Sequence, residues 1–171
     1  RNDMTIAVET ITEDKDTDAL LHDEEIAQYR EPGIICDLDG TLALKHNGRT
    51  WFDASTCDAD LINEPIKDLV NMMWSSHHII FCSGREDKYR EPTMKFLNKC
   101  FSNKIEGHDF DLFMRETDDF RKDSIIKHEL YYAHIEPRWN IHIVLDDRKQ
   151  VVDMWRNAIG LTTLQVAEGN F

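Results

Sequence analysis

Two carboxylates separated by a single residue, Asp37 and Asp39, are the side chains of this sequence that most directly suggest chemistry. They follow the apolar residues 34–36 and precede Gly40 and Thr41, an order that predicts a buried strand ending in a polar turn. Because side chains alternate along a strand, both carboxylates leave its end on the same side and repel each other. A divalent metal, a phosphate held by cations, or both would offset that repulsion; the alternative is an acidic turn with no function.

Polar groups also follow two later apolar runs. The triplet Ser83-Gly84-Arg85 follows one run, and the pair Asp146-Asp147 follows the other. In parallel α/β sheets ligands bind beyond the carboxyl ends of the strands, so these groups would meet at one edge. Four carboxylates there would form an oxygen site that favours Mg²⁺ over zinc. The sequence therefore predicts a magnesium site at one edge of a sheet.

Basic side chains that could reach the same edge are Arg49, Arg85, Arg115, Arg121, Lys122 and Lys127. A metal with lysine and arginine around carboxylates suits phosphoryl transfer, because that reaction spreads charge over phosphate oxygens. An aspartate can attack phosphorus to form an acyl phosphate, and a second acid can protonate the leaving oxygen and then activate water. Asp123 and Lys127 are four residues apart on a predicted helix, so we expect them to pair.

Strand-like and helix-like segments alternate along the chain and must position these groups. Apolar runs predict strands near residues 34–36, 78–82, 110–114, 141–145 and 162–166, and helical spacing predicts helices within residues 62–73, 92–101, 123–132 and 151–159. The fold class is therefore α/β, with a Rossmann-like parallel sheet and helices on both faces. Asn47-Gly48 predicts the turn of a small flap hairpin within residues 42–53, after the first strand.

Composition divides the chain into two parts. Residues 1–31 hold much of the acidic charge and few large apolar groups, so we expect an acidic tail or interdomain linker there and one domain in residues 32–171. The net charge of −13 argues against a protein that grips long nucleic acid through many phosphates, but not against a site for one terminal phosphate. Since the chain begins with Arg1, we expect a fragment of a longer protein.

Cysteine usage and hydropathy bear on location. The four cysteines form no CxxC pair, and two of them lie in apolar runs, which favours buried thiols in a reducing cytoplasm. No apolar run has the length of a membrane span, and the N-terminus lacks the order of a signal peptide. We expect a cytoplasmic protein with no membrane partner.

Taken together, these motifs resemble those of the haloacid-dehalogenase (HAD) phosphohydrolases, and more closely the 3′-phosphatase domain of bacteriophage polynucleotide kinase-phosphatases. The similarity extends over residues 32–171, and its motifs are residues 37–43, 47–49, 83–86, 121–123, 146–148, 150–152, 154–156 and 165–171. It makes Phe171 the expected C-terminus. Relative to the family pattern the flap is one residue longer, around Lys45-His46.

The resemblance implies a role for each catalytic residue. Asp37 would be the nucleophile that accepts the phosphate, and Asp39 would be the general acid and then the general base. Ser83 would donate a hydrogen bond to the phosphate. Lys127, which aligns with the family pattern where Lys122 does not, would neutralise Asp37 and the phosphate, and Asp123 would hold Lys127 in place.

It also implies ligands for metal and substrate. Mg²⁺ would be bound by the carboxylates of Asp37 and Asp146 and by the backbone carbonyl of Asp39. Asp147 would bind it through water or orient the neighbouring groups. The substrate-binding residues would be Thr41, Arg49, Gly84, Arg85 and Arg115.

The function that the resemblance implies is a magnesium-dependent polynucleotide 3′-phosphatase acting in DNA or RNA end repair. Its substrates would be 3′-phosphate and 2′,3′-cyclic phosphate ends, and it would act through an aspartyl-phosphate. Residues 53–77 and 115–123 are too short for a large cap domain, so we expect an open site that admits a bulky substrate. The alternatives are a HAD phosphatase of free nucleotides or small phosphoesters, and a degenerate binding module without activity.

Partners follow from the same resemblance. No GxxxxGK[ST] motif occurs in the chain, so a 5′-kinase domain is expected N-terminal to Arg1 in the parent protein. Homo-oligomers are expected as in phage relatives, and a phage-encoded protein would work in the host cytoplasm.

Overall fold

The computed structural model describes residues 30–46 and 48–169. The chain divides into two units, Arg1–Arg30 and Glu31–Phe171, and the fold below is that of the second. Nearly all of the predicted acidic tail or linker lies outside the described residues, so that assignment stays a prediction. In the described part of the chain, no helix has the length and apolar character needed to cross a membrane.

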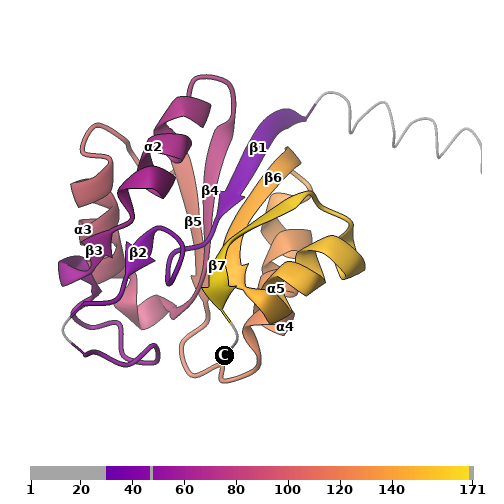
Figure 1. Cartoon of the computed structure of the whole chain (residues 1–171). Coiled ribbons are helices and arrows are strands. Elements are labelled where there is room, and N and C mark those ends of the chain that lie inside the picture. The colour runs from indigo at the N-terminus through magenta and orange to yellow at the C-terminus, as the bar shows by residue number, and fades with distance from the viewer. Residues whose placement is uncertain (1–29, 47, 170–171) are drawn as a thin grey trace, which may run out of the picture. The chain divides into compact units, whose positions relative to one another are not determined.

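A parallel five-stranded sheet forms the centre of the second unit, with strand order β5-β4-β1-β6-β7 (Figure 1). Its strands are β1 (Glu31–Cys36), β4 (His78–Glu86), β5 (Phe110–Arg115), β6 (Trp139–Arg148) and β7 (Thr163–Gly169). Every adjacent pair is parallel, which confirms the predicted α/β class. β1 lies in the middle, so its carboxyl end is flanked by those of β4 and β6.

Helices cover both faces of this sheet, as predicted. α2 (Glu64–Met73) and α3 (Arg90–Cys100) lie on one face, and α4 (Asp123–Leu130) and α5 (Lys149–Asp153) lie on the other (Figure 1). Short helical turns η1 (Cys57–Ala59) and η2 (Asp87–Tyr89) precede α2 and α3, while η3 (Tyr131–Ile135) and η4 (Met154–Ile159) extend α4 and α5. Gly160 ends η4 with φ 90°, a left-handed conformation that glycine adopts without strain.

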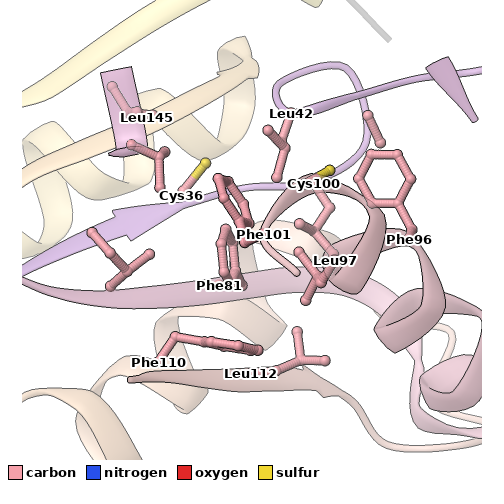
Figure 2. Close-up of a cluster of buried hydrophobic side chains, with 14 of the residues drawn as sticks. Cys36, Leu42, Phe81, Phe96, Leu97, Cys100, Phe101, Phe110, Leu112 and Leu145 are labelled. Carbon is pink, nitrogen blue, oxygen red and sulfur yellow. The ribbon is translucent and has the colours of Figure 1, made fainter. Parts of the chain in front are cut away.

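The alternation of side chains along the strands produces two separate cores. Ile34 and Cys36 of β1 pack on the α2–α3 side, whereas Ile35 packs on the other side with Trp155. In the first core the ring centroids of Phe81 and Phe110 lie 5.4 Å apart in an edge-to-face arrangement (Figure 2). Burial on both faces explains why β1 and β4 read as continuous apolar runs rather than as alternating ones.

Strands β4 and β6 run further than the sequence indicated. Ser83 and Arg85 lie inside β4, and Asp146 and Asp147 lie inside β6, not after them. The ladder between β4 and β5 shifts register after Ser83, and the β6–β7 ladder shifts after Asp146. Pairing therefore continues past the polar residues through irregular ladders, which re-aim side chains at the sheet edge.

The flap differs from the predicted hairpin. β2 (Ala43–Leu44) pairs antiparallel with β3 (Leu61–Ile62), so its two strands are joined by the long connection 45–60. Gly48 has φ 68°, as expected of a turn residue, but residues 49–60 form no strand. Asn47 lies outside the described residues. The prediction of a tight hairpin at Asn47-Gly48 is wrong, because β2 finds its partner where Leu61 and Ile62 supply strand-forming side chains.

Candidate active site

The carboxyl ends of β1, β4 and β6 surround a cavity of about 500 Å³. Backbone pairing fixes the position of Asp37 at this edge, because its N–H donates to Leu145 O at 2.9 Å. Nine of the residues predicted from the sequence line the cavity: Asp37, Asp39, Gly84, Arg85, Arg115, Asp123, Lys127, Asp146 and Asp147. Three strands that are far apart in the sequence thus deliver their polar groups to one place.

Lys127 connects two of the carboxylates. Its Nζ lies 2.6 Å from Asp37 Oδ1 and 2.8 Å from Asp146 Oδ2, and all three side chains are buried. Burial alone would lower the pKa of Lys127, but the charges of Asp146 and Asp37 raise it well above its ordinary value. The lysine therefore stays charged, whereas Lys122 is exposed at the rim of the same cavity.

The carboxylates of Asp37, Asp146 and Asp147 form a buried cluster, in which one oxygen of each lies within 4.8 Å of the others. Burial, followed by the charges of Asp146 and Asp147, raises the pKa of Asp37 against the opposing effect of Lys127. Burial and the charge of Asp146 raise the pKa of Asp147 to about 6. Three ionised carboxylates and the one ammonium of Lys127 have a net charge of −2. This charge and the all-oxygen set of ligand atoms fit a hard divalent cation.

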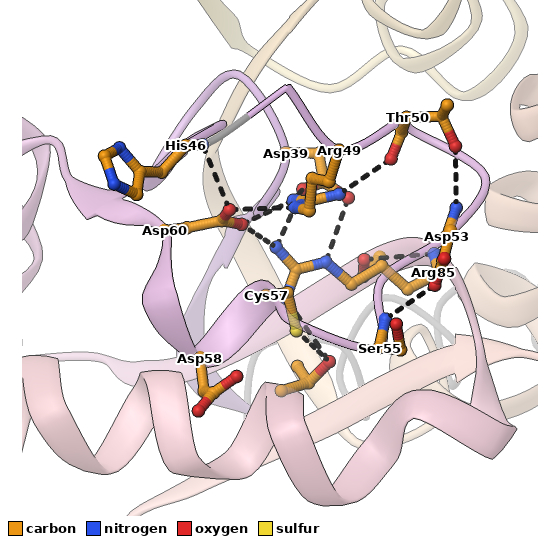
Figure 3. A network of polar contacts seen from close by, with 12 residues as sticks. Asp39, His46, Arg49, Thr50, Asp53, Ser55, Cys57, Asp58, Asp60 and Arg85 are labelled. Atoms are coloured by element: carbon orange, nitrogen blue, oxygen red, sulfur yellow. Dashed lines mark hydrogen bonds and ion pairs between the residues drawn. The ribbon is translucent and has the colours of Figure 1, made fainter.

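Asp39 is not part of this cluster and is held by two arginines (Figure 3). Arg85 donates to it at 2.7 Å and 2.9 Å, and Arg49 donates at 2.7 Å. Burial by itself would raise the pKa of Asp39, but Arg85 and then Arg49 lower it below its ordinary value. The candidate acid–base group is therefore ionised in the free chain.

A second buried carboxylate, Asp60, completes this network. Arg49 donates to both of its oxygens, with Nε 2.8 Å from Oδ1, and Arg85 Nη2 lies 3.3 Å from Oδ2 (Figure 3). Asp60 was not among the predicted site residues. No local pattern distinguishes it from its exposed neighbour Asp58, because its burial depends on how the connection 45–60 folds back over the sheet edge.

Asp123 does not hold Lys127 as expected. Its carboxylate instead accepts hydrogen bonds from Arg115 Nη2 and, at 2.6 Å, from Arg148 Nη1. Arg148 was not among the predicted site residues. The i, i+4 spacing permits an Asp123–Lys127 contact but does not require it. Here the carboxylate of Asp123 binds two guanidinium groups, from Arg115 of β5 and Arg148 of β6, instead.

Arg115 and Gly84 support this arrangement. Arg115 Nε lies 2.7 Å from Gly84 O, and its Nη1 donates to Asp119 O and Arg121 O, so most of its donors point into the protein. A Cβ on Gly84 would lie 2.7 Å from Asp123 Oδ1, so any side chain there would displace the carboxylate. The contact of Arg115 with substrate stays a prediction, although the guanidinium lines the cavity.

Three predicted residues lie behind the cavity lining. Thr41 Oγ1 is 3.2 Å from Asp37 Oδ2, and Arg49 binds the Asp39 and Asp60 carboxylates, so both act on other site residues. Ser83 is buried, and its Oγ accepts the Arg85 N–H at 3.2 Å, which leaves its O–H to donate. The direct substrate contacts expected of Thr41, Arg49 and Ser83 stay predictions.

Comparisons with known proteins agree with this geometry. The model of the family described as "Polynucleotide kinase PNKP phosphatase domain" matches residues 31–171. A "Putative bifunctional polynucleotide kinase/RNA ligase" of Autographa californica nuclear polyhedrosis virus is 35% identical over 127 residues, in a match that covers 72% of this chain and 18% of that protein.

Solved structures are similar as well. A chain of "Structure of the Pnkp1/Rnl/Hen1 RNA repair complex" matches with a TM-score of 0.76 and 45% identity, over 83% of this chain and 44% of that one. The class C acid phosphatase from Bacillus anthracis, with tungstate bound, matches with a TM-score of 0.53 and 17% identity over 91% of this chain and 75% of that one, and shares the fold. The chain spans less than half the length of the polynucleotide-repair relatives described here.

Proposed function

The chain belongs to the family of polynucleotide kinase PNKP phosphatase domains, and from this membership we propose that it removes the 3′-terminal phosphate from DNA or RNA ends. The observation that carries the proposal is the cluster of Asp37, Asp146 and Lys127 in an open cavity that also contains Asp39. We extend the proposal to 2′,3′-cyclic phosphate ends.

In this mechanism Asp37 is the nucleophile. One of its carboxylate oxygens attacks phosphorus and forms an aspartyl-phosphate, while the bond from phosphorus to the 3′ oxygen breaks. Lys127, 2.6 Å from Asp37, neutralises charge on the attacked phosphate, and Ser83 donates its hydroxyl hydrogen to a phosphate oxygen.

Asp39 moves the proton. It gives a proton to the departing 3′ oxygen and then takes one from the water that attacks the aspartyl-phosphate. Arg85 and Arg49 keep Asp39 ionised in the free chain, so its acid role requires that the proton be acquired after the substrate enters. Return of the proton after hydrolysis regenerates the starting state.

Asp37, Asp146 and Asp147, with the backbone carbonyl of Asp39, would hold a Mg²⁺ ion. The bound cation would supply charge neutralisation for the phosphate oxygens. Without it, burial and the repulsion among the three carboxylates together raise the pKa values of Asp37 and Asp147.

Because the chain spans 44% of its match in the RNA repair complex and 18% of the viral kinase/ligase, we also propose that it works as one domain of a larger end-repair protein. A 5′-kinase domain N-terminal to Arg1 and a homo-oligomeric assembly belong to that proposal. The longer gene and the mass of the native protein in solution test these two points.

The decisive experiment compares kcat/KM for a 3′-phosphorylated oligonucleotide, its 5′-phosphorylated and 2′,3′-cyclic counterparts, and a 3′-mononucleotide, each with Mg²⁺. We expect the 3′-phosphorylated oligonucleotide to be the best substrate and Asp37→Asn to be inactive. Equal efficiency on the mononucleotide would identify a phosphatase of small phosphoesters. Hydrolysis of none of them would identify a binding module, and activity retained by Asp37→Asn would refute the mechanism.

A further inference from the structure

Two phenylalanines at the cavity are unusually exposed. Phe52 is 89% exposed and Phe120 is 80% exposed, and these are the highest values among the large apolar side chains that the structure describes. Both line the same cavity as Asp37, Asp39 and Lys127. A folded chain gains by burying such rings, so two of them at one site suggest an apolar ligand there.

The two rings come from separate loops at the carboxyl edge of the sheet. Phe52 lies in the connection between β2 and β3, and Phe120 lies in the segment between β5 and α4 (Figure 1). A ligand bound at the cavity could therefore contact both rings while its phosphate reaches Asp37. Neither loop is part of the packed core, so the rings contribute nothing to it.

Other aromatic residues of the cavity are already engaged. Lys45 Nζ lies 4.6 Å from the centroid of the Trp51 ring, and Lys88 Nζ lies 5.2 Å from that of Tyr89. Within residues 30–46 and 48–169, neither Phe52 nor Phe120 has a ring or cation contact. Their faces are open to a ligand.

Charge argues for stacking as the source of affinity. The chain carries a net charge of −13, so long-range electrostatics oppose the approach of a polynucleotide. Stacking of a base on an aromatic ring does not depend on net charge and tolerates any base sequence. Beside Phe120, the exposed Lys122 also lines the cavity and can meet a neighbouring phosphate.

We propose that Phe52 and Phe120 form a stacking platform for the terminal nucleobases of a single strand whose 3′ phosphate occupies the cavity. The inference rests on the proposed function, because it names what lies next to the phosphate. A cavity of about 500 Å³ is the size of a site for a nucleotide-sized ligand. The platform would favour a polynucleotide end over a small phosphoester.

The test uses the 171-residue chain with Phe52→Ala, Phe120→Ala and, as a control, Tyr132→Ala, an aromatic residue 48% exposed outside the cavity. The substrates are a 3′-phosphorylated single strand, the same strand with an abasic terminal nucleotide, and p-nitrophenyl phosphate. We expect each phenylalanine variant to lose about tenfold in kcat/KM on the normal strand. Activity on the other two substrates should be retained, and Tyr132→Ala should match the parent on all three.

Unchanged kcat/KM of both phenylalanine variants on the normal strand would overturn the inference and leave the proposed function standing. A loss that is equal on all three substrates would also overturn it, because the rings would then support the site and not the base.

A second measurement does not need catalysis. Stacking quenches a 2-aminopurine placed at the 3′ terminus, so we expect the parent chain to quench it and the phenylalanine variants to quench it less. Quenching tests the stacking platform even if the chain hydrolyses no strand. Failure to hydrolyse any strand would refute only the proposed function. Absence of quenching by the parent chain would overturn the stacking platform. The platform would also be overturned if Phe52→Ala and Phe120→Ala changed the oligomeric state but not the quenching, because the rings would then contact a second copy of the chain.

Discussion

Arg85 holds the Asp39 carboxylate at two points, with Nη2 2.7 Å from Oδ1 and Nε 2.9 Å from Oδ2. A two-point guanidinium–carboxylate pair is both strong and directional. The residue proposed to move the proton is thus positioned by a residue that the sequence had indicated for phosphate binding. The two roles are connected, because a change in Arg85 alters the position and charge state of Asp39.

Arg85→Met should make the chain more sensitive to acid. The arginines lower the pKa of Asp39 below its ordinary value of 3.8, so this pair stabilises the fold above that pH and the contribution is lost as the pH falls through the lowered pKa. Without Arg85 the pKa of Asp39 rises, and acid unfolding followed by circular dichroism should begin at a higher pH. The exposed Arg138→Met is the control, and an identical acid midpoint in Arg85→Met would contradict the coupling.

Lys127→Met should destabilise the fold as well as abolish phosphatase activity. It removes the cation that lies 2.6 Å from Asp37 and 2.8 Å from Asp146, and leaves buried carboxylates unpaired. We expect a loss of about 3–5 kcal/mol in the free energy of unfolding at pH 8. Urea denaturation measures it, with the exposed Lys122→Met expected within about 0.5 kcal/mol of the parent. Equal stability of the two variants would show that Lys127 is not the compensating charge.

Mg²⁺ should stabilise the chain against heat. A cation that relieves the repulsion among Asp37, Asp146 and Asp147 binds the folded state, and at a hundred times its dissociation constant it adds about 2.7 kcal/mol. Differential scanning fluorimetry should show a rise in Tm that EDTA reverses. Asp146→Asn should lose most of that rise, whereas Asp153→Asn, a partly exposed carboxylate on α5 outside the acidic cluster, should keep it. If Asp146→Asn kept the full Mg²⁺-dependent rise in Tm, the metal would bind at another site.

Asp60→Asn should lower kcat by at least about 100-fold. Asp60 accepts hydrogen bonds from Arg49 and Arg85, so the neutral amide weakens the ion pairs that orient the two guanidinium groups holding Asp39, and a small displacement of a catalytic group costs about 100-fold in rate. The effect should fall on kcat for the 3′-phosphorylated strand, and the Mg²⁺-dependent rise in Tm should remain. Asp58→Asn, in the same helical turn but exposed, is the matched control. Equal rates for the two variants would rule out a positioning role for Asp60.

The cysteine thiols should be unreactive in the folded chain. All four cysteines are buried and free, and burial raises the pKa of Cys82 and of Cys100 to about 12. At pH 8 a thiol-specific disulfide reagent should label none of them until denaturant unfolds the chain, when all four react. Fast labelling of the folded chain would show that one of these side chains is accessible.

The parallel sheet, its two helical layers and the meeting of the acidic side chains at one edge could be predicted from the sequence. Apolar runs, alternation and parallel topology are short-range or sheet-wide constraints, so they place Asp37, Asp146 and Asp147 at one edge whatever the loops do. Lys127 was assigned over Lys122 from the family resemblance, and α4, which follows β5, carries it to the same edge.

Which carboxylate pairs with which cation could not be predicted in the same way. Asp60 reaches Arg49 and Arg85 because the connection 45–60 folds back between β2 and β3. Asp123 binds Arg115 and Arg148, not Lys127 one turn away. Such pairs join segments whose relative positions depend on the whole packed fold, and a carboxylate takes the guanidinium group that the fold brings nearest. Spacing along the chain can permit a contact such as Asp123–Lys127, but the groups that the fold brings near a carboxylate determine which contact forms.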